Sequence, residues 1–218
     1  MDDEPTYKAY QALPPTAKGQ ATRERMVEAA TEVFCRLGYE ATRVADINEQ
    51  AGVSHGLFYR HFRDKADILL AALERMNAQL RHTSGRADGD EDELSFALLE
   101  RRNVLFFSEY AHNRKLFRVA REVAARTDEV EFREVWLRMR NRYVQRTHRW
   151  LDHLVALAAI DPLPDTGLVA AALGALTEQL AYVEIGLPVE EPEPAMIERL
   201  GNICTFIWYR TIKGAAPC

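Results

Sequence analysis

The side chains best suited to chemistry in this sequence lie close together in its N-terminal third. Ser54 is of a type that caps helices, and the helix that it would begin carries His55 and Gly56 in its first turn, with Tyr59 and Arg60 about one turn later. Such a helix start also offers free backbone N–H groups to anions, and Gly56 leaves room for a close backbone approach. A helix placed in the major groove presents groups of these kinds to base edges and phosphates together. The pattern therefore favours binding of duplex DNA.

Three helices are needed to position these side chains. Apolar residues recur at helical spacing over residues 22–37, and Gly38 would end that helix in a left-handed conformation. Thr42 can cap a second helix that ends at Ala51, Gly52 can form a tight turn, and Ser54 can cap a third helix that ends near residue 62. Two such short helices bury little surface alone, so the first must pack across them as a helix-turn-helix unit.

The remainder of the chain also reads as helical. Asp64 followed by Asp67 predicts a capping box for a fourth helix to about residue 81, and residues 83–93 read as a solvated connection. Further helices are expected over residues 99–110, 116–125, 128–158, 165–187 and 194–211. We therefore predict an all-α chain of about nine helices, with a flexible arm at 1–20, a helix-turn-helix domain at 21–66 and a helical effector-binding and dimerisation domain at 67–218.

Composition limits which partners and which cellular location can be expected for this protein. The net charge of −5 does not exclude a local basic face. Three cysteines, without metal-ligand spacing, fit a reduced compartment, and neither a metal nor a cofactor is expected. No run approaches the roughly 18 apolar residues of a membrane helix, and the acidic N-terminus is unlike a secretory signal. We expect a cytoplasmic protein that does not bind membranes.

A series of short runs stands out within about residues 22–73: Gly38-Tyr-Glu-Ala-Thr42, Val44-Ala-Asp-Ile47, Ala51-Gly-Val-Ser54, Gly56-Leu-Phe-Tyr59, His61-Phe62 and Lys65. Together these runs closely resemble the N-terminal domain of the tetracycline-repressor (TetR) family of bacterial regulators. The resemblance implies a homodimeric transcriptional regulator, usually a repressor that a small molecule releases from a quasi-palindromic operator. The rest of the chain is similar to the family only in its length and helical layout.

Carried over by position, the resemblance implies three groups of DNA contacts. Thr42 and Arg43 would meet the DNA backbone or groove, and Tyr59, His61 and Lys65 would bind phosphates. Ser54, His55 and Leu57 would face bases, with Leu57 making an apolar contact such as one to a thymine methyl group. With Gly56 and Arg60 these residues form the predicted DNA-binding set, and the domain's core is expected from Val44, Ile47, Ala51, Val53, Phe58 and Phe62.

A second predicted site lies in the C-terminal part. Aromatic and apolar residues at helical spacing are most simply core, but polar side chains share their stripes and need internal partners, water or a ligand. A mainly apolar cavity with a few polar groups suits a small, mostly apolar effector. The predicted contacts are Asn103, Phe106, Tyr110, Trp136, Met139, Tyr143, Thr147, Gln179 and Tyr182.

The last two helices are predicted to form the dimer. Small residues, including Gly174, lie beside a leucine and valine stripe over residues 169–187, and the last helix is apolar on more than one face, including Leu200. Two such helices from each subunit would form an isologous four-helix interface, which a charge at Gly174 or Leu200 should dissociate.

Two other classes of protein compete with this interpretation. An enzyme lacks support, because the sequence has no GxSxG motif of serine hydrolases, no HExxH motif of zinc proteases, and neither a Walker loop nor a dinucleotide-binding fingerprint. Its histidines also do not pair with a nucleophile at an informative spacing. A helical scaffold without DNA would make the third-helix pattern a coincidence. The basic residues between Arg101 and Arg126 are interleaved with acidic ones, so a solvated face is favoured there, and a further role is left open.

Overall fold

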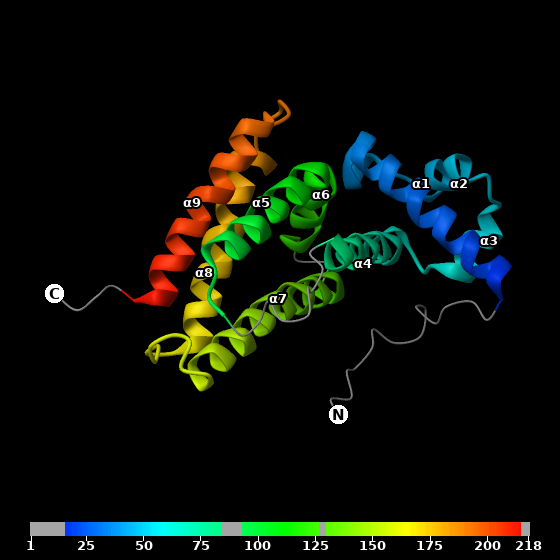
Figure 1. The fold of residues 1–218 in the computed structure, drawn as a ribbon. Helices are drawn as coiled ribbons and strands as arrows, with labels where there is room; N and C mark the ends of the chain where they lie inside the picture. The colour runs from blue at the N-terminus through cyan, green and yellow to red at the C-terminus, as the bar shows by residue number, and fades with distance from the viewer. Residues whose placement is uncertain (1–15, 84–92, 127–129, 215–218) are drawn as a thin grey trace. The chain divides into compact units, whose positions relative to one another are not determined.

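The computed structural model describes residues 16–83, 93–126 and 130–214, and these residues form helices and connections without any strand. The helices are α1 (Ala17–Ala41), α2 (Val44–Ala51), α3 (His55–His61), α4 (Lys65–Thr83), α5 (Phe96–His112), α6 (Arg114–Ala124), α7 (Val130–Ala156), α8 (Thr166–Ala181) with the π-helical turn η1 (Tyr182–Gly186), and α9 (Pro194–Lys213) (Figure 1). This confirms the predicted all-α class, with a helix-turn-helix head, formed by α1 to α3 and the first turn of α4, followed by a helical C-terminal part.

The chain divides into two compact units. Unit 1 comprises residues 1–78 and 115–137, and unit 2 comprises residues 79–114 and 138–218. Helix α7 contributes its first turns to unit 1 and the remainder to unit 2. This division follows packing, whereas the predicted boundary after residue 66 followed the motif, and that functional boundary stays a prediction.

In unit 1, α1 begins earlier than the sequence pattern indicated. The Thr16 hydroxyl caps its first turn by accepting a hydrogen bond from the Gly19 N–H at 3.1 Å. Residues 17–20 are therefore helical and not part of an arm, while residues 1–15 of the predicted arm lie outside the described residues. Gly38 at φ 76° and Gly52 at φ 63° both have the positive φ predicted for them: Gly38 kinks α1 three residues before its last residue, Ala41, and Gly52 caps the end of α2.

The start of α2 corrects the prediction for Thr42. Arg43 is the N-cap, and its backbone N–H donates to Asp46 Oδ2 at 2.8 Å. The Thr42 hydroxyl points back and donates to the Gly38 carbonyl at 2.6 Å, because Thr42 ends the first helix instead of beginning the second. At the other end of α2, Arg25 Nε donates to the Ala51 carbonyl at 3.1 Å and thereby ties α1 to α2.

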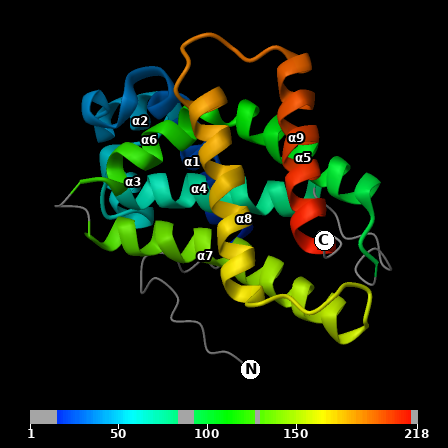
Figure 2. The same ribbon diagram turned by 90° about the vertical axis from the view of Figure 1, so that its left-hand side faces the viewer.

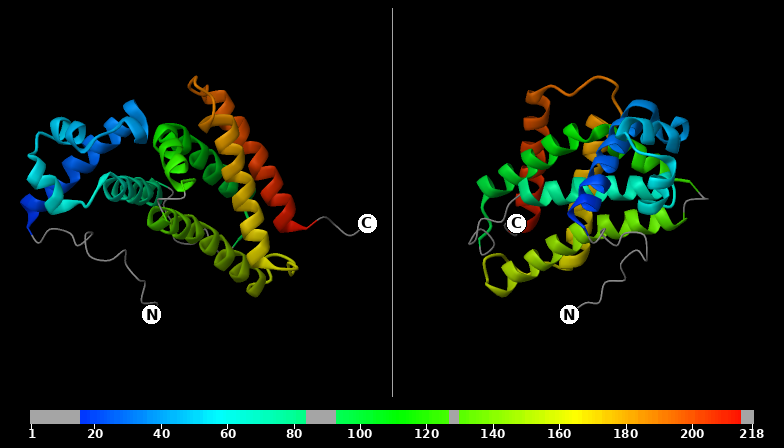
Figure 3. Two further views of the ribbon diagram at one scale, coloured as in Figure 1. Left: turned by 180° about the vertical axis from the view of Figure 1, so that it is seen from behind. Right: turned by 90° about the vertical axis from the view of Figure 1, so that its right-hand side faces the viewer.

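In unit 2, α5 packs closely against α9 (Figure 3). A Cβ at Gly201 would lie 2.4 Å from Val104 Cγ2 and 2.8 Å from Val104 Cα, so this approach requires glycine. Two buried polar bonds link α9 to its neighbours: Asn103 Nδ2 of α5 donates to Thr205 Oγ1 at 3.0 Å, and Trp208 Nε1 donates to Thr177 Oγ1 of α8 at 2.9 Å. Polar groups of α5, α8 and α9 therefore satisfy one another inside this unit.

The end of the eighth helix is wider than the predicted continuous α-helix. Residues 182–186 form a π-helical turn, in which the Leu187 N–H donates to the Tyr182 carbonyl at 2.8 Å. A Cβ at Gly186 would lie 3.1 Å from both the Tyr110 hydroxyl and the Tyr182 ring. Glycine lets both aromatic side chains approach this backbone.

Helices α8 and α9 run in opposite directions (Figure 2). Both helices carry exposed apolar side chains. These are Leu168, Leu176 and Val183 on α8 and its π-turn, and Ile203 and Phe206 on α9. Gly174 and Leu200 do not belong to this face, because both are buried inside unit 2. A charge at either would disturb the fold of the subunit, so they are the wrong positions at which to test a dimer.

One stretch of the described chain, Thr166–Gly186, is long and apolar enough to cross a membrane by length and composition, with a mean hydropathy of 1.3 in its best window. This single stretch is weak evidence for a membrane span, because the core helix of a soluble protein can be equally long and apolar.

Candidate nucleic-acid interface

Helix α3 presents most of its polar side chains to solvent. Ser54 Oγ accepts a hydrogen bond from the Leu57 N–H at 3.3 Å, as predicted for an N-cap. Phe58 is fully buried and anchors the opposite side of the helix, together with Phe62 and with Ile47 of α2. This anchoring leaves Ser54, His55, Gly56, Tyr59 and Arg60 exposed, with Leu57 and His61 partly covered.

The His55 and Tyr59 side chains lie together on the exposed face. Their ring centroids are 5.0 Å apart in an edge-to-face arrangement, and Tyr59 is 47% exposed. Between them in sequence, a Cβ at Gly56 would meet nothing within 4 Å. Internal packing therefore does not require glycine at this position, which leaves the backbone of the first turn open to approach from outside.

Two members of the predicted set are engaged inside the head. Thr42 is 2% exposed and its hydroxyl is bonded to Gly38. Lys65 Nζ donates to the Tyr39 carbonyl at 2.8 Å and to the Thr42 carbonyl at 3.4 Å, and it lies 4.2 Å from the centre of the Tyr39 ring. Lys65 thus satisfies carbonyls at the C-terminal end of α1, where a cation is favourable. For both side chains the geometry indicates a role in holding the head together.

Positive charge gathers at the C-terminal end of α3. Burial, followed by the nearby charges of Arg23 and Arg60, lowers the pKa of His61 below its usual value. His61 is therefore mainly neutral at pH 7, because a lowered pKa disfavours the imidazolium. Arg43, at the start of α2, is also exposed. Basic groups from α1, α2 and α3 accordingly lie in the same small head.

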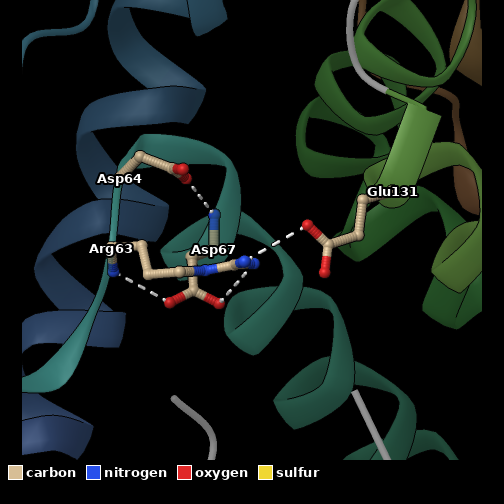
Figure 4. Close-up of polar contacts among 4 residues, drawn as sticks. All are labelled: Arg63, Asp64, Asp67 and Glu131. Atoms are coloured by element: carbon tan, nitrogen blue, oxygen red, sulfur yellow. Dashed lines mark hydrogen bonds and ion pairs between the residues drawn. The ribbon is translucent and has the colours of Figure 1, made fainter. Parts of the chain in front are cut away.

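A group of charged side chains that sequence reasoning missed joins the head to α7 (Figure 4). Arg63 Nη1 lies 3.2 Å from Glu131 Oε2, and the Arg63 backbone N–H donates to Asp67 Oδ2 at 3.0 Å. The Asp67 N–H donates to Asp64 Oδ1 at 2.8 Å, which confirms one half of the predicted capping box. In the other half, the Asp67 side chain reaches Arg63 instead of Asp64. Glu131 is distant in sequence, so no local pattern could have revealed this contact.

Two arginines of the central basic run also have specific partners. Arg114 is 5% exposed and donates to the carbonyls of Pro188 and Val189, each at 3.1 Å, and Glu190 at 2.6 Å. Arg126 forms an ion pair with Glu40. The interpretation of this run as a merely solvated face is therefore wrong for Arg114, because a guanidinium can satisfy several loop carbonyls at once.

The predicted effector contacts are not all brought together. Trp136 belongs to unit 1, where its ring lies 6.4 Å from that of Phe117, and Gln179 is exposed on α8. Asn103 is buried and bonded to Thr205, and the Thr147 hydroxyl donates to the Tyr143 carbonyl of its own helix at 3.3 Å.

The aromatic members of that set do form a cluster in unit 2. The Phe106 ring centroid lies 6.2 Å from those of both Tyr110 and Tyr143. Burial raises the pKa of Tyr143 to about 12. Met139 is buried in the same unit, and Tyr182 is half-buried beside Gly186. Across the described ranges, no three His, Cys, Asp or Glu side chains gather in a way that could hold a metal ion.

Comparison with known proteins places the strongest sequence likeness in the head. Residues 26–72 match the model of the bacterial regulatory proteins of the tetR family. The HTH-type transcriptional regulator TtgR of Pseudomonas putida is 39% identical over 77 residues, which is 35% of this chain and 36% of TtgR. The match thus spans about a third of that relative's length.

Solved structures share the fold over most of the chain. GusR of Salmonella enterica has a TM-score of 0.72 at 18% identity, covering 89% of this chain and 97% of GusR. The transcriptional regulator FadR of Bacillus subtilis, solved in complex with stearoyl-CoA, has a TM-score of 0.66 at 20% identity, covering 87% of this chain and 98% of FadR. The family is one of regulatory proteins, not enzymes. Residues 26–72 thus carry the sequence pattern of the bacterial regulatory proteins of the tetR family, and the chain as a whole shares the fold of these solved structures.

Proposed function

We propose that this protein is a sequence-specific DNA-binding transcriptional regulator, acting in the cytoplasm as a repressor that a small molecule releases. The observation that carries DNA binding is the exposed face of α3. His55, Tyr59 and Arg60 are presented to solvent around a glycine that internal packing does not require. In this proposal Ser54, His55 and Leu57 read bases, and Arg43, Tyr59, Arg60 and His61 contact phosphates. Thr42 and Lys65 support the head that carries them.

A selection experiment tests DNA binding directly. The protein is used to enrich duplexes from a randomised library, and a quasi-palindrome with half-sites about one helical turn apart is expected. Tyr59→Phe and Arg43→Ala should weaken binding to all duplexes, and Arg43→Ala should also reduce the dependence on salt. His55→Ala should instead change the preferred bases. Enrichment of no sequence over the starting library would contradict the proposal and favour a scaffold that does not bind DNA.

Dimerisation is proposed through α8 and α9, because their exposed apolar side chains form a face that a subunit alone leaves in water. Leu176→Glu or Phe206→Glu should yield a monomer at micromolar concentration by light scattering, since each places a charge on this face. Leu157→Glu is the matched control, because Leu157 is exposed on the connection that follows α7. A wild-type monomer at that concentration would contradict the proposed dimer.

Control by an effector is proposed from the aromatic cluster of Phe106, Tyr110 and Tyr143 in unit 2. Rings of this kind suit a small, mostly apolar ligand, and FadR, which shares the fold, binds stearoyl-CoA. Native mass spectrometry of the purified protein should detect a co-purifying compound that Tyr143→Ala loses. Calorimetry with that compound should show weaker binding to the operator-bound protein than to the free protein, because the coupling between two ligands is reciprocal. Equal affinities would rule out induction.

A further inference from the structure

The junction between α3 and α4 is held by one arginine that faces two carboxylates. The Arg63 guanidinium lies 3.2 Å from Glu131 of α7 and 3.9 Å from Asp67 of α4 (Figure 4). The Arg63 backbone N–H is also bonded to Asp67. Arg63 follows the C-terminal end of the proposed recognition helix, α3. A restraint on Arg63 therefore also restrains the direction in which the chain leaves α3.

Asp67 is the buried partner of Arg63 in this group. Its side chain is 1% exposed, and its burial raises the pKa of the carboxyl group, against the opposing effect of the Arg63 N–H and guanidinium. A buried carboxylate needs such donors, so Asp67 keeps Arg63 in place. Glu131 is 57% exposed and lies on a different helix, and it is therefore the partner that can be exchanged without opening the core.

A second ion pair attaches the same part of the chain to the head. Arg126, just before α7, pairs with Glu40 of α1 and lies 6.0 Å from the centre of the Tyr39 ring. Helix α7 then continues to Ala156, and its later turns carry Tyr143 of the aromatic cluster. One helix thus has its start fixed to the proposed recognition head and its remainder in the unit of the proposed effector site.

We propose that Glu131 is a positioning residue for DNA recognition. Through Arg63 it fixes the α3–α4 junction in the arrangement that binds the operator, and α7 is thereby the element through which the C-terminal unit acts on α3. This inference rests on the proposed function, because it assigns Glu131 a part in DNA binding although Glu131 does not touch DNA.

The direction in which Glu131→Gln changes the affinity for DNA separates this positioning role from a general effect of charge. Glu131→Gln removes a negative charge, which by itself should strengthen binding to a phosphate backbone. If Glu131 positions the junction, the same substitution weakens binding instead, by about threefold. The control is Glu122→Gln, which removes the charge of an exposed glutamate of α6 in the same unit. The affinities are measured with the duplex selected by the wild-type protein.

A double-mutant cycle identifies the partner. In an Arg63→Gln background, Glu131→Gln should cause no further weakening, since the pair is already broken. Tighter binding by Glu131→Gln, or an equal weakening with and without Arg63, would overturn the proposal. Melting temperatures measured in parallel should stay within a few degrees of wild type, so that a change in affinity is not a loss of fold.

Hydrogen exchange tests the junction without DNA. Amides of residues 58–68, which include the bonded N–H groups of Phe62, Arg63 and Asp67, should exchange faster in Glu131→Gln than in Glu122→Gln. Equal exchange would overturn the proposal even if DNA is bound. If the selection recovers no DNA, the proposed function fails by itself, and the exchange result still shows whether Glu131 restrains the junction.

Discussion

The two units use glycine and polar side chains in opposite ways. In the head, Gly56 has free space around it, and its polar neighbours on α3 face solvent. In unit 2, Gly201 is pressed against the backbone of Val104, and Asn103 and Thr177 are bonded to other helices. Helix α3 therefore keeps its polar side chains available for another molecule, whereas unit 2 uses many of its own to hold itself together.

Gly201→Ala should have the largest effect, because it tests the packing side of this comparison. Its Cβ would lie below 3.0 Å from backbone atoms of Val104, which cannot move without separating α5 from α9. We expect a loss of stability of about 3 kcal/mol, at the upper end for overpacking, measured by urea unfolding. An unchanged midpoint would show that these two helices do not touch in solution as they do here.

Thr177→Val tests the polar side of the same unit. The Thr177 hydroxyl accepts from Trp208 Nε1 at 2.9 Å and donates to the Leu173 carbonyl at 2.9 Å. Valine has nearly the same shape but leaves the buried indole N–H without its acceptor, which should cost about 2 kcal/mol. Thr211→Val, on the exposed side of α9, is the control and should change stability by less than about 0.5 kcal/mol.

High pH should weaken unit 2 through Tyr143. Folding raises the pKa of this phenol from 10.0 to about 12, so the folded protein favours the neutral form. That contribution is fully present below pH 10 and is lost as the pH rises from 10 towards 12, amounting to about 1 kcal/mol by pH 11. Urea midpoints at pH 9 and 11 should therefore fall more steeply for the wild type than for Tyr143→Phe. Parallel curves would contradict this assignment.

Gly56→Ala should have the smallest effect on stability and the opposite sign. Alanine meets no neighbour at this position and favours the helix by up to about 1 kcal/mol over glycine. If DNA approaches the α3 backbone, the added methyl group should nevertheless weaken operator binding while the protein melts higher. A variant that is both more stable and binds equally well would show that the glycine serves no close contact with DNA.

The head could be predicted from sequence because its bonds are local. The Ser54 cap reaches three residues forward, and the turns at Gly38 and Gly52 need only a left-handed residue. Thr42 shows the limit of such reasoning, since a threonine between two helices can bond in either direction and only the path of the chain decides. Its hydroxyl serves the end of α1.

The bonds of unit 2 and of α7 could not be predicted in this way. Asn103 and Thr205 are 102 residues apart, and Arg63 and Glu131 are 68 residues apart. Periodicity correctly placed Asn103 on a buried face, yet it could not tell an internal partner from a ligand. Gln179 shares the helical pattern of its neighbours but faces outward, because the orientation of α8 is set by its packing against other helices.

The hydrogen bonds from Arg114 to the loop before α9 affect how fast a protease can cleave that loop. Val189 is 82% exposed, and Glu190 and Glu191 beside it are exposed as well. Exposed loop segments are the usual sites of proteolysis, so a protease that cleaves after glutamate can reach this one. Cleavage requires the segment to enter the protease as a free extended strand, whereas the Arg114 guanidinium holds three of its carbonyls. The loop should therefore be accessible yet slow to be cut, and Arg114→Lys, which cannot hold all three carbonyls, should be nicked there first.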